Sequence, residues 1–236
     1  MTLSRAIVEQ LVGEARAKIG ATPLTKAADA LHKALVAGGF SYSIVGGYAV
    51  QHYGYVRGTQ DLDAIVNDRD NVRHYLAATG QFKAAPGQQT VIHKATGVRV
   101  DLLPAGRRNS PDSIPYPQPA ASFHKDSNHL TIHFIDLPGL VTLKLDAGRP
   151  QDEADVVGLI QSNQLTDKFV TYLPEKYRED FLQCLHKANK SLESRQVDPL
   201  EAGGLYYGPG TVSEQAQQML DSEGYVFKQP RDLGAF

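Results

Sequence analysis

The chain has 236 residues, 42% of them hydrophobic and 21% charged, a composition that is ordinary for a globular core and excludes disorder throughout. Its 24 basic and 26 acidic residues nearly cancel, so no overall positive field is present to hold DNA, and we expect no DNA partner. No stretch approaches the about 18 apolar residues of a membrane span, and residues 1–20 lack the apolar core of a signal peptide. We therefore expect a cytoplasmic protein without a membrane partner, whose single cysteine, Cys184, packs within a helix.

Two amphipathic helices are predicted before the first strand. Apolar residues recur at helical spacing over residues 4–19 and again over 23–37, where Thr22 can cap the helix and Pro23 can begin it. The second helix leads into an apolar strand over residues 42–45.

Two motifs follow this strand, a diglycine turn and a pair of carboxylates. Gly46 and Gly47 open a short helix, so bare N–H groups and the positive end of the helix dipole can face a phosphate. Residues 61–66 are predicted as a strand, and because side chains alternate, Asp61 and Asp63 point to one face while apolar neighbours enter a core. Residues two apart on a strand are separated by about 6.5 Å, so both acids can reach one cation or bridge two cations about 3.5–4 Å apart. Phosphate and Mg²⁺ ligands side by side predict nucleotide chemistry.

Further strands complete a predicted mixed sheet. A helix is expected over residues 68–79, followed by strands over 90–94, 98–103 and 129–135. Within 98–103, Asp101 lies on the face opposite to the apolar residues beside it, which makes it the candidate for a third carboxylate.

The pattern changes from residue 104 onward. Residues 104–119 are rich in Pro, Ser and Arg without periodicity, which is compatible with either a lid or a disordered surface loop. Helices are predicted from Pro138, over 152–162 and from Pro174, and a Gly- and Tyr-rich tail follows with one short helix after Ser213.

These elements predict an α/β (α+β) fold, in which a small mixed β-sheet is flanked by helices and followed by a helical C-terminal part. The expected division places the sheet and its two N-terminal helices in residues 1–137. The helical region and its tail then occupy residues 138–236.

The conjunction of motifs resembles a known superfamily. A strand ending in Gly-Gly, thirteen intervening residues, Asp-Leu-Asp at the start of the next strand and a lone Asp on a later strand resemble the nucleotidyltransferases typified by DNA polymerase β. The run Arg57-x-Thr59-x-Asp61-x-Asp63 looks like the branch of minimal and antibiotic nucleotidyltransferases and type IV abortive-infection toxins. The segment KLDAGRPQDEADVVGLI, residues 144–160, is similar to a helical segment of that branch. Toxin relatives commonly carry a basic residue where Gln151 stands.

The resemblance implies a nucleotidyltransferase core and a metal-dependent transfer of an NMP from an NTP to a hydroxyl acceptor, with release of pyrophosphate. It implies that Asp61 and Asp63 hold Mg²⁺ or Mn²⁺ on the triphosphate. Asp101 would hold a second ion and accept the proton of the attacking hydroxyl. The implied nucleotide contacts are Gly46, Gly47, Arg57, Thr59 and Lys144.

Alternatives remain open at this point. The acceptor is a small hydroxylated molecule, a tRNA end or a protein side chain, and near-neutral charge favours the small molecule. A catalytically silent nucleotide-binding or partner-binding module of the same fold is the competing hypothesis. Lys144 can equally be a surface lysine, with Asp152 and Asp155 on a solvated helix face. His129 and His133 share a strand face, but without a third ligand at diagnostic spacing they do not predict zinc.

Overall fold

The computed structural model describes residues 22–87, 89–119 and 132–195. The chain divides into two compact units, Met1–Ser191 and Leu192–Phe236, and the elements described below lie in the first, apart from the end of the last helix. The helix expected over residues 4–19 and the tail with its helix after Ser213 lie outside the described residues. Among the described helices, none is both long and apolar enough to cross a lipid bilayer.

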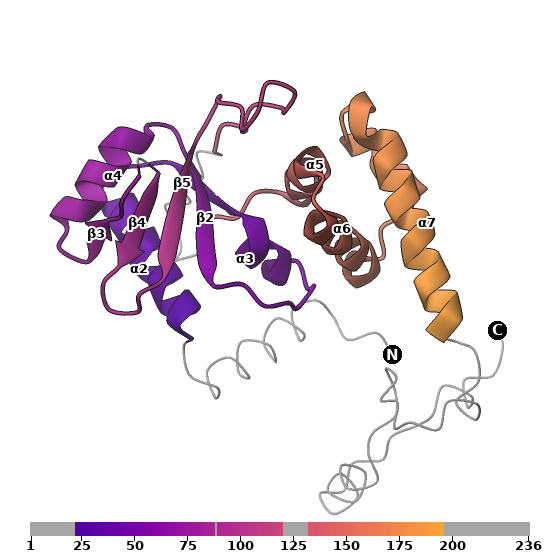
Figure 1. The fold of residues 1–236 in the computed structure, drawn as a ribbon, viewed down its shortest axis with the longest axis horizontal. Coiled ribbons are helices and arrows are strands. Elements are labelled where there is room, and N and C mark those ends of the chain that lie inside the picture. Colours follow the sequence, from indigo (N-terminus) through magenta and orange to yellow (C-terminus); the bar gives the residue numbers. More distant parts are fainter. Residues whose placement is uncertain (1–21, 88, 120–131, 196–236) are drawn as a thin grey trace, which may run out of the picture. The chain divides into compact units, whose positions relative to one another are not determined.

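Five strands form one mixed sheet in the order β1-β2-β5-β4-β3. Only β2 and β5 run parallel, and the other neighbouring pairs are antiparallel. In Figure 1 the strands lie side by side, with α3 between β2 and the C-terminal helices. The expected fold class, a mixed sheet flanked by helices and followed by a helical part, is confirmed. The strands are β1 (Tyr42–Val45), β2 (Asp61–Val66), β3 (Phe82–Ala84), β4 (Thr90–His93) and β5 (Arg99–Pro104).

One face of the sheet is covered by α2 (Pro23–Ala37) and α4 (Arg69–Ala78). The Thr22 side chain caps α2, as its sequence predicts, and accepts a hydrogen bond from the Thr25 N–H at 3.2 Å. The apolar side chains that β2 and β5 turn toward these helices are fully buried, which leaves the alternate positions, including the acids, for the opposite face. These buried residues are Leu62, Ala64, Val66, Val100 and Leu102.

The opposite face meets the short helix α3 (Gly46–His52) and the C-terminal helices. The left-handed Gly148 ends α5, and Pro150 begins α6 two residues later. Side chains from β1, β2 and all these helices share a second core, in which Cys184 is buried as predicted. The C-terminal elements are α5 (Leu137–Ala147), α6 (Pro150–Asn163), the 3₁₀ turns η1 (Asp167–Tyr172) and η2 (Glu175–Tyr177), and α7 (Arg178–Arg195).

Two expectations about elements need correction, and one strand was not expected. The strand expected over 129–135 is, in its described part, a single bridge between Ile44 and Phe134, because the chain turns into α5 at Leu137. The short strand β3 was not predicted. The last helix begins at Arg178 rather than at Pro174, since η2 occupies the intervening turn.

Residues 104–119 form a folded excursion on the end of β5. Its two arms exchange backbone hydrogen bonds, from Gly106 N–H to Tyr116 O at 2.8 Å and from Tyr116 N–H to Arg107 O at 2.9 Å. The excursion is attached to α5, because the Ile114 N–H donates to Oδ1 of Asp146 at 3.0 Å. The expected alternative of a disordered loop is therefore wrong.

Candidate functional site

The acids predicted to form the site lie on one face of the sheet. Because β2 and β5 are parallel and in register, Asp63 is directly opposite Asp101, and Asp61 is opposite Arg99. Adjacent strands are about 4.8 Å apart, so Asp63 and Asp101 are neighbours although 37 residues separate them in the chain. Alternation along each strand places all three acids on the side away from α2 and α4.

Asp63 is the electrostatic centre of this group. Its pKa is raised to about 6, first by burial and then by the negative charges of Asp61 and Asp101, while Lys144 and Arg149 act in the opposite direction. Ionised Asp63 is therefore disfavoured by burial and by two neighbouring carboxylates, and a bound cation would stabilise it.

The outer two acids are held by threonines. Thr59 donates from Oγ1 to Oδ1 of Asp61 at 3.2 Å, and Thr90 donates to Oδ1 of Asp101 at 2.5 Å. Arg99 is 3.7 Å from the same Oδ1 of Asp101. In the part of the chain that the structure describes, no group of three or more His, Cys, Asp or Glu side chains is arranged to hold a metal ion.

The diglycine turn is packed against the acids. Gly46 has φ of 66°, and a Cβ there would lie 1.9 Å from Oδ2 of Asp63. A Cβ on Gly47 would lie 2.6 Å from Oγ1 of Thr59 and 3.0 Å from Nη2 of Arg57. Both glycines therefore bring the backbone close to groups that the sequence assigned to the site.

Arg57 and Lys144, expected as phosphate contacts, both direct their charges at α6. Arg57 makes a bidentate pair with Asp155, with Nε–Oδ1 at 2.6 Å and Nη2–Oδ2 at 2.9 Å. Lys144 Nζ lies 2.8 Å from a carboxylate oxygen of both Asp152 and Asp155. All of Lys144, Asp152 and Asp155 are buried, so the alternatives of a surface lysine and a solvated helix face are wrong. Their side chains form a buried ion network.

Arg149 joins this network from its exposed edge and was not among the predicted site residues. It donates to Asp152 through Nε at 2.6 Å and Nη2 at 3.2 Å, while 72% of its side chain is exposed. Burial would raise the pKa of Asp152, but hydrogen bonds from Arg149 and Lys144 hold it below its ordinary value. The available signal was its place directly before Pro150, inside the segment that resembles the known branch.

A pocket of about 460 Å³ opens beside Asp63. Of the predicted site residues, Gly46, Asp63 and Lys144 line it, together with Arg149. The excursion supplies one wall through Tyr116, whose pKa is raised by burial and then by Asp63 and Asp146. The remaining lining residues are Val45, Leu103, Asn109, Ser110, Ser113, Leu140, Leu143, Asp146, Ala147 and Asp152. Sequence reasoning did not identify the excursion as part of this site.

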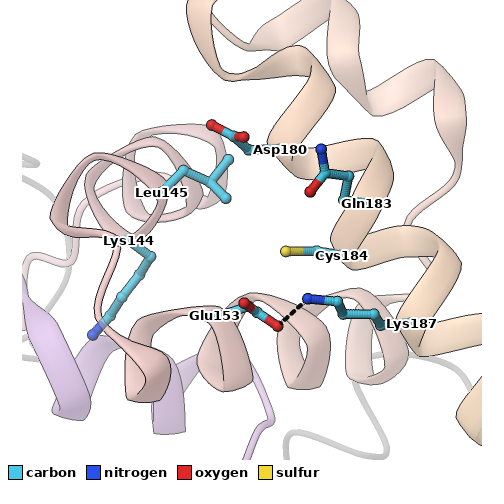
Figure 2. Close-up of a pocket in the computed structure, with 8 residues that line it drawn as sticks. Lys144, Leu145, Glu153, Asp180, Gln183, Cys184 and Lys187 are labelled. Atoms are coloured by element: carbon cyan, nitrogen blue, oxygen red, sulfur yellow. Dashed lines mark hydrogen bonds and ion pairs between the residues drawn. The ribbon is translucent and has the colours of Figure 1, made fainter.

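A second, smaller pocket of about 220 Å³ lies among α5, α6 and α7. Figure 2 shows the ammonium of Lys144 directed away from the side chains that α7 contributes. Glu153 and Lys187 pair across this pocket at 2.5 Å, and burial raises the pKa of the Cys184 thiol to about 11. A thiol with that pKa is protonated at neutral pH, so this pocket lacks an activated nucleophile at Cys184.

No family model matches the chain, and no curated protein matches it. Among solved structures, the chain is similar to an antigenic nucleotidyltransferase-like protein from Paracoccidioides brasiliensis. The two are 15% identical, and the match covers 72% of this chain and 87% of that one with a TM-score of 0.43. The chain is also similar to the antibiotic-resistance factor ANT(2'')-Ia, with 14% identity, 70% and 92% coverage and a TM-score of 0.38.

Proposed function

We propose that the chain is a metal-dependent nucleotidyltransferase that transfers an NMP from an NTP to a hydroxyl acceptor and releases pyrophosphate. The observation that carries the proposal is the in-register pairing of Asp63 with Asp101, with Asp61 on the same face. Gly46 brings the chain against Asp63 where a side chain has no room. Carboxylates beside a bare backbone turn are what a cation-bound phosphate requires.

Mg²⁺ or Mn²⁺ fits the donor chemistry of this group, because carboxylate oxygens are hard ligands and the pKa of Asp63 is raised by burial and then by the charges of Asp61 and Asp101. Asp61 and Asp63 would hold the ion on the triphosphate, and Asp101 the second. When bound, the ions stabilise charge on the attacking and leaving oxygens. In the proposal Asp101 releases Thr90, turns toward Asp63 and accepts the proton of the acceptor hydroxyl.

The phosphates would lie between the diglycine turn and the ion network. In this network three cations face two carboxylates, so the network itself carries one positive charge in excess. Lys144 and Arg149 line the pocket and supply that charge to the leaving pyrophosphate. Gly46 and Gly47 would donate backbone N–H groups, and Thr59 would steady Asp61. The rest of the pocket would take the nucleoside and a small hydroxylated acceptor in preference to tRNA.

The test is transfer of label. The protein is incubated with each labelled NTP and Mg²⁺ in the presence of RNA, protein and metabolite fractions, and the labelled fraction identifies the acceptor class. Asp63→Asn should lower transfer by about 10²–10³-fold through loss of one charged contact in the transition state. Asp101→Asn should lower it further, because a general base contributes about 10²–10⁴-fold.

Asp70→Asn is the matched control, because Asp70 lies on α4 with 69% of its side chain exposed and pairs with Arg69. Its transfer rate should equal that of the wild type. Wild-type activity in Asp101→Asn would remove the role given to that residue. Nucleotide binding without transfer to any fraction would favour the silent module, for which the hydrogen bond between Thr90 and Asp101 is the supporting observation.

A further inference from the structure

The connection between α3 and β2, residues 53–60, lies along α6; we call it the strap. Near its start, the Asn163 side chain donates from Nδ2 to Tyr53 O at 2.9 Å. Two residues on, the Tyr55 ring packs on Gly158 so closely that a Cβ there would be 2.4 Å from the ring. The strap therefore runs antiparallel to α6.

The third contact of this series is the pair between Arg57 and Asp155, which is bidentate. Asp155 is fully buried and also receives Lys144 at 2.8 Å and Gln151 Nε2 at 3.2 Å. The side-chain amide of Gln51 on α3 donates to Arg57 O. A planar guanidinium held at two nitrogens by a carboxylate and fixed at its own backbone has one orientation.

That orientation reaches the candidate site. A Cβ on Gly47 would lie only 3.0 Å from Nη2 of Arg57. It would lie 2.6 Å from Oγ1 of Thr59, which occupies the neighbouring space. The Thr59 hydroxyl then donates to Oδ1 of Asp61 at 3.2 Å. Arg57 and Thr59 thus lie beside the same space over Gly47, and the series leads from a buried carboxylate on α6 to the first acid of β2.

We propose that Asp155 is a positioning residue that fixes Arg57 and the strap against the diglycine turn, and so sets the place of Thr59 and the Asp61 carboxylate. This inference rests on the proposed function for its effect on catalysis. It assigns Arg57 a structural partner in the protein in place of a phosphate. A displacement of about 1 Å in a reacting group can lower a rate about 10²-fold, so positioning of this kind is visible in kinetics.

The first test is structural and needs no activity. In protein labelled at threonine methyl groups, the Thr59 resonance reports on the strap and the Thr90 resonance on the opposite acid, with Thr59→Ser assigning the first. Asp155→Asn should shift or broaden the Thr59 resonance and leave the Thr90 resonance unchanged. Arg57→Gln should also shift or broaden the Thr59 resonance and leave the Thr90 resonance unchanged. Because Arg57 is the more exposed partner of the pair, this variant can be used if Asp155→Asn does not fold.

Glu153→Gln is the matched control on the same helix. Glu153 pairs with Lys187 at the surface, and both side chains are about half exposed. Loss of this ion pair in Glu153→Gln should leave the Thr59 and Thr90 resonances unchanged. An unchanged Thr59 resonance in Arg57→Gln would overturn the inference.

The second test separates positioning from direct phosphate contact. Asp155→Asn and Arg57→Gln should each lower kcat by about 10- to 100-fold with little change in the KM for the NTP, and the double variant should lose no more than either. A phosphate contact by Arg57 predicts instead a raised KM in Arg57→Gln alone and additive losses, which would overturn the inference. If wild-type protein transfers no label, the proposed function fails, while the Thr59 resonance still decides whether Asp155 positions the strap.

Discussion

Gly46 and Gly39 adopt the same left-handed backbone in different surroundings. Their φ angles are 66° and 71°. A Cβ on Gly46 would lie 1.9 Å from Oδ2 of Asp63, whereas a Cβ on Gly39 would meet nothing within 4 Å. Gly39 thus needs glycine for its backbone alone, and Gly46 needs it also because of the carboxylate.

Comparing alanine substitutions at Gly39 and Gly46 separates the cost of backbone strain from the cost of disturbing the packing of the site. Gly39→Ala should lower the free energy of unfolding by about 1–2 kcal/mol, the cost of a left-handed alanine. Gly46→Ala carries the same cost and must also displace Asp63, so it should lose more stability and weaken Mn²⁺ binding. Urea unfolding and Mn²⁺ titration of both variants measure this. Equal losses of stability would mean that Asp63 moves aside freely.

Asp63 should also give the protein a pH-dependent stability. Its folded pKa of about 6 exceeds the value of about 3.9 in an unfolded chain, so the folded protein keeps this proton to higher pH. The free energy of unfolding therefore falls as pH rises from about 4 to about 6, by on the order of 2 kcal/mol, and then levels off.

Asp63→Asn isolates this contribution, because the amide carries no charge at either pH. The variant should be more stable than the wild type at pH 7.5 and similar to it at pH 4.5 in metal-free buffer. Mg²⁺ should narrow the difference at pH 7.5 by stabilising the ionised carboxylate. Urea unfolding midpoints of both proteins at the two pH values measure this difference in stability. An equal difference at pH 4.5 and pH 7.5 would contradict the raised pKa of Asp63.

At the level of elements, the sequence located what its local pattern encodes. The strands Tyr42–Val45 and Asp61–Val66 and the Thr22 cap follow from alternation, glycine and capping chemistry. The three-residue β3 lacks the length to carry a periodic signal, and it exists because it pairs with β4. The sequence did not decide whether residues 104–119 are ordered, because the excursion is attached through the side chain of Asp146, which lies on α5.

The candidate site shows the same difference between features that local sequence predicts and features that depend on long-range contacts. Alternation predicts that Asp101 shares a face with Asp61, but only the parallel register places it opposite Asp63. The burial of Asp155 was not predictable locally, because its partner Arg57 lies 98 residues away. A charged residue on a helix has the same sequence pattern whether it meets water or a distant guanidinium.

At the scale of the described molecule, two cores meet across the sheet. The first contains α2, α4 and one face of the strands, and the second joins β1 and β2 to α5, α6 and α7. Ile65 of β2 belongs to the second core, so the strand that carries the acids is packed by the C-terminal helices. The expected division into 1–137 and 138–236 stays a prediction, and this shared core provides a way to examine it.

We expect the two cores to unfold together, because β2 contributes to both. Leu159 on α6 and Leu76 on α4 are fully buried in different cores, and either change to alanine should cost about 2–5 kcal/mol. In a single cooperative unit, Leu159→Ala should accelerate exchange of the slowest amide hydrogens of β4 and of α6 by the same factor, as should Leu76→Ala. Hydrogen exchange followed by mass spectrometry measures both regions in one sample. If Leu159→Ala accelerates exchange in α6 while β4 is unaffected, the helices open separately, and the division near residue 137 describes the folding units better than a single cooperative body does.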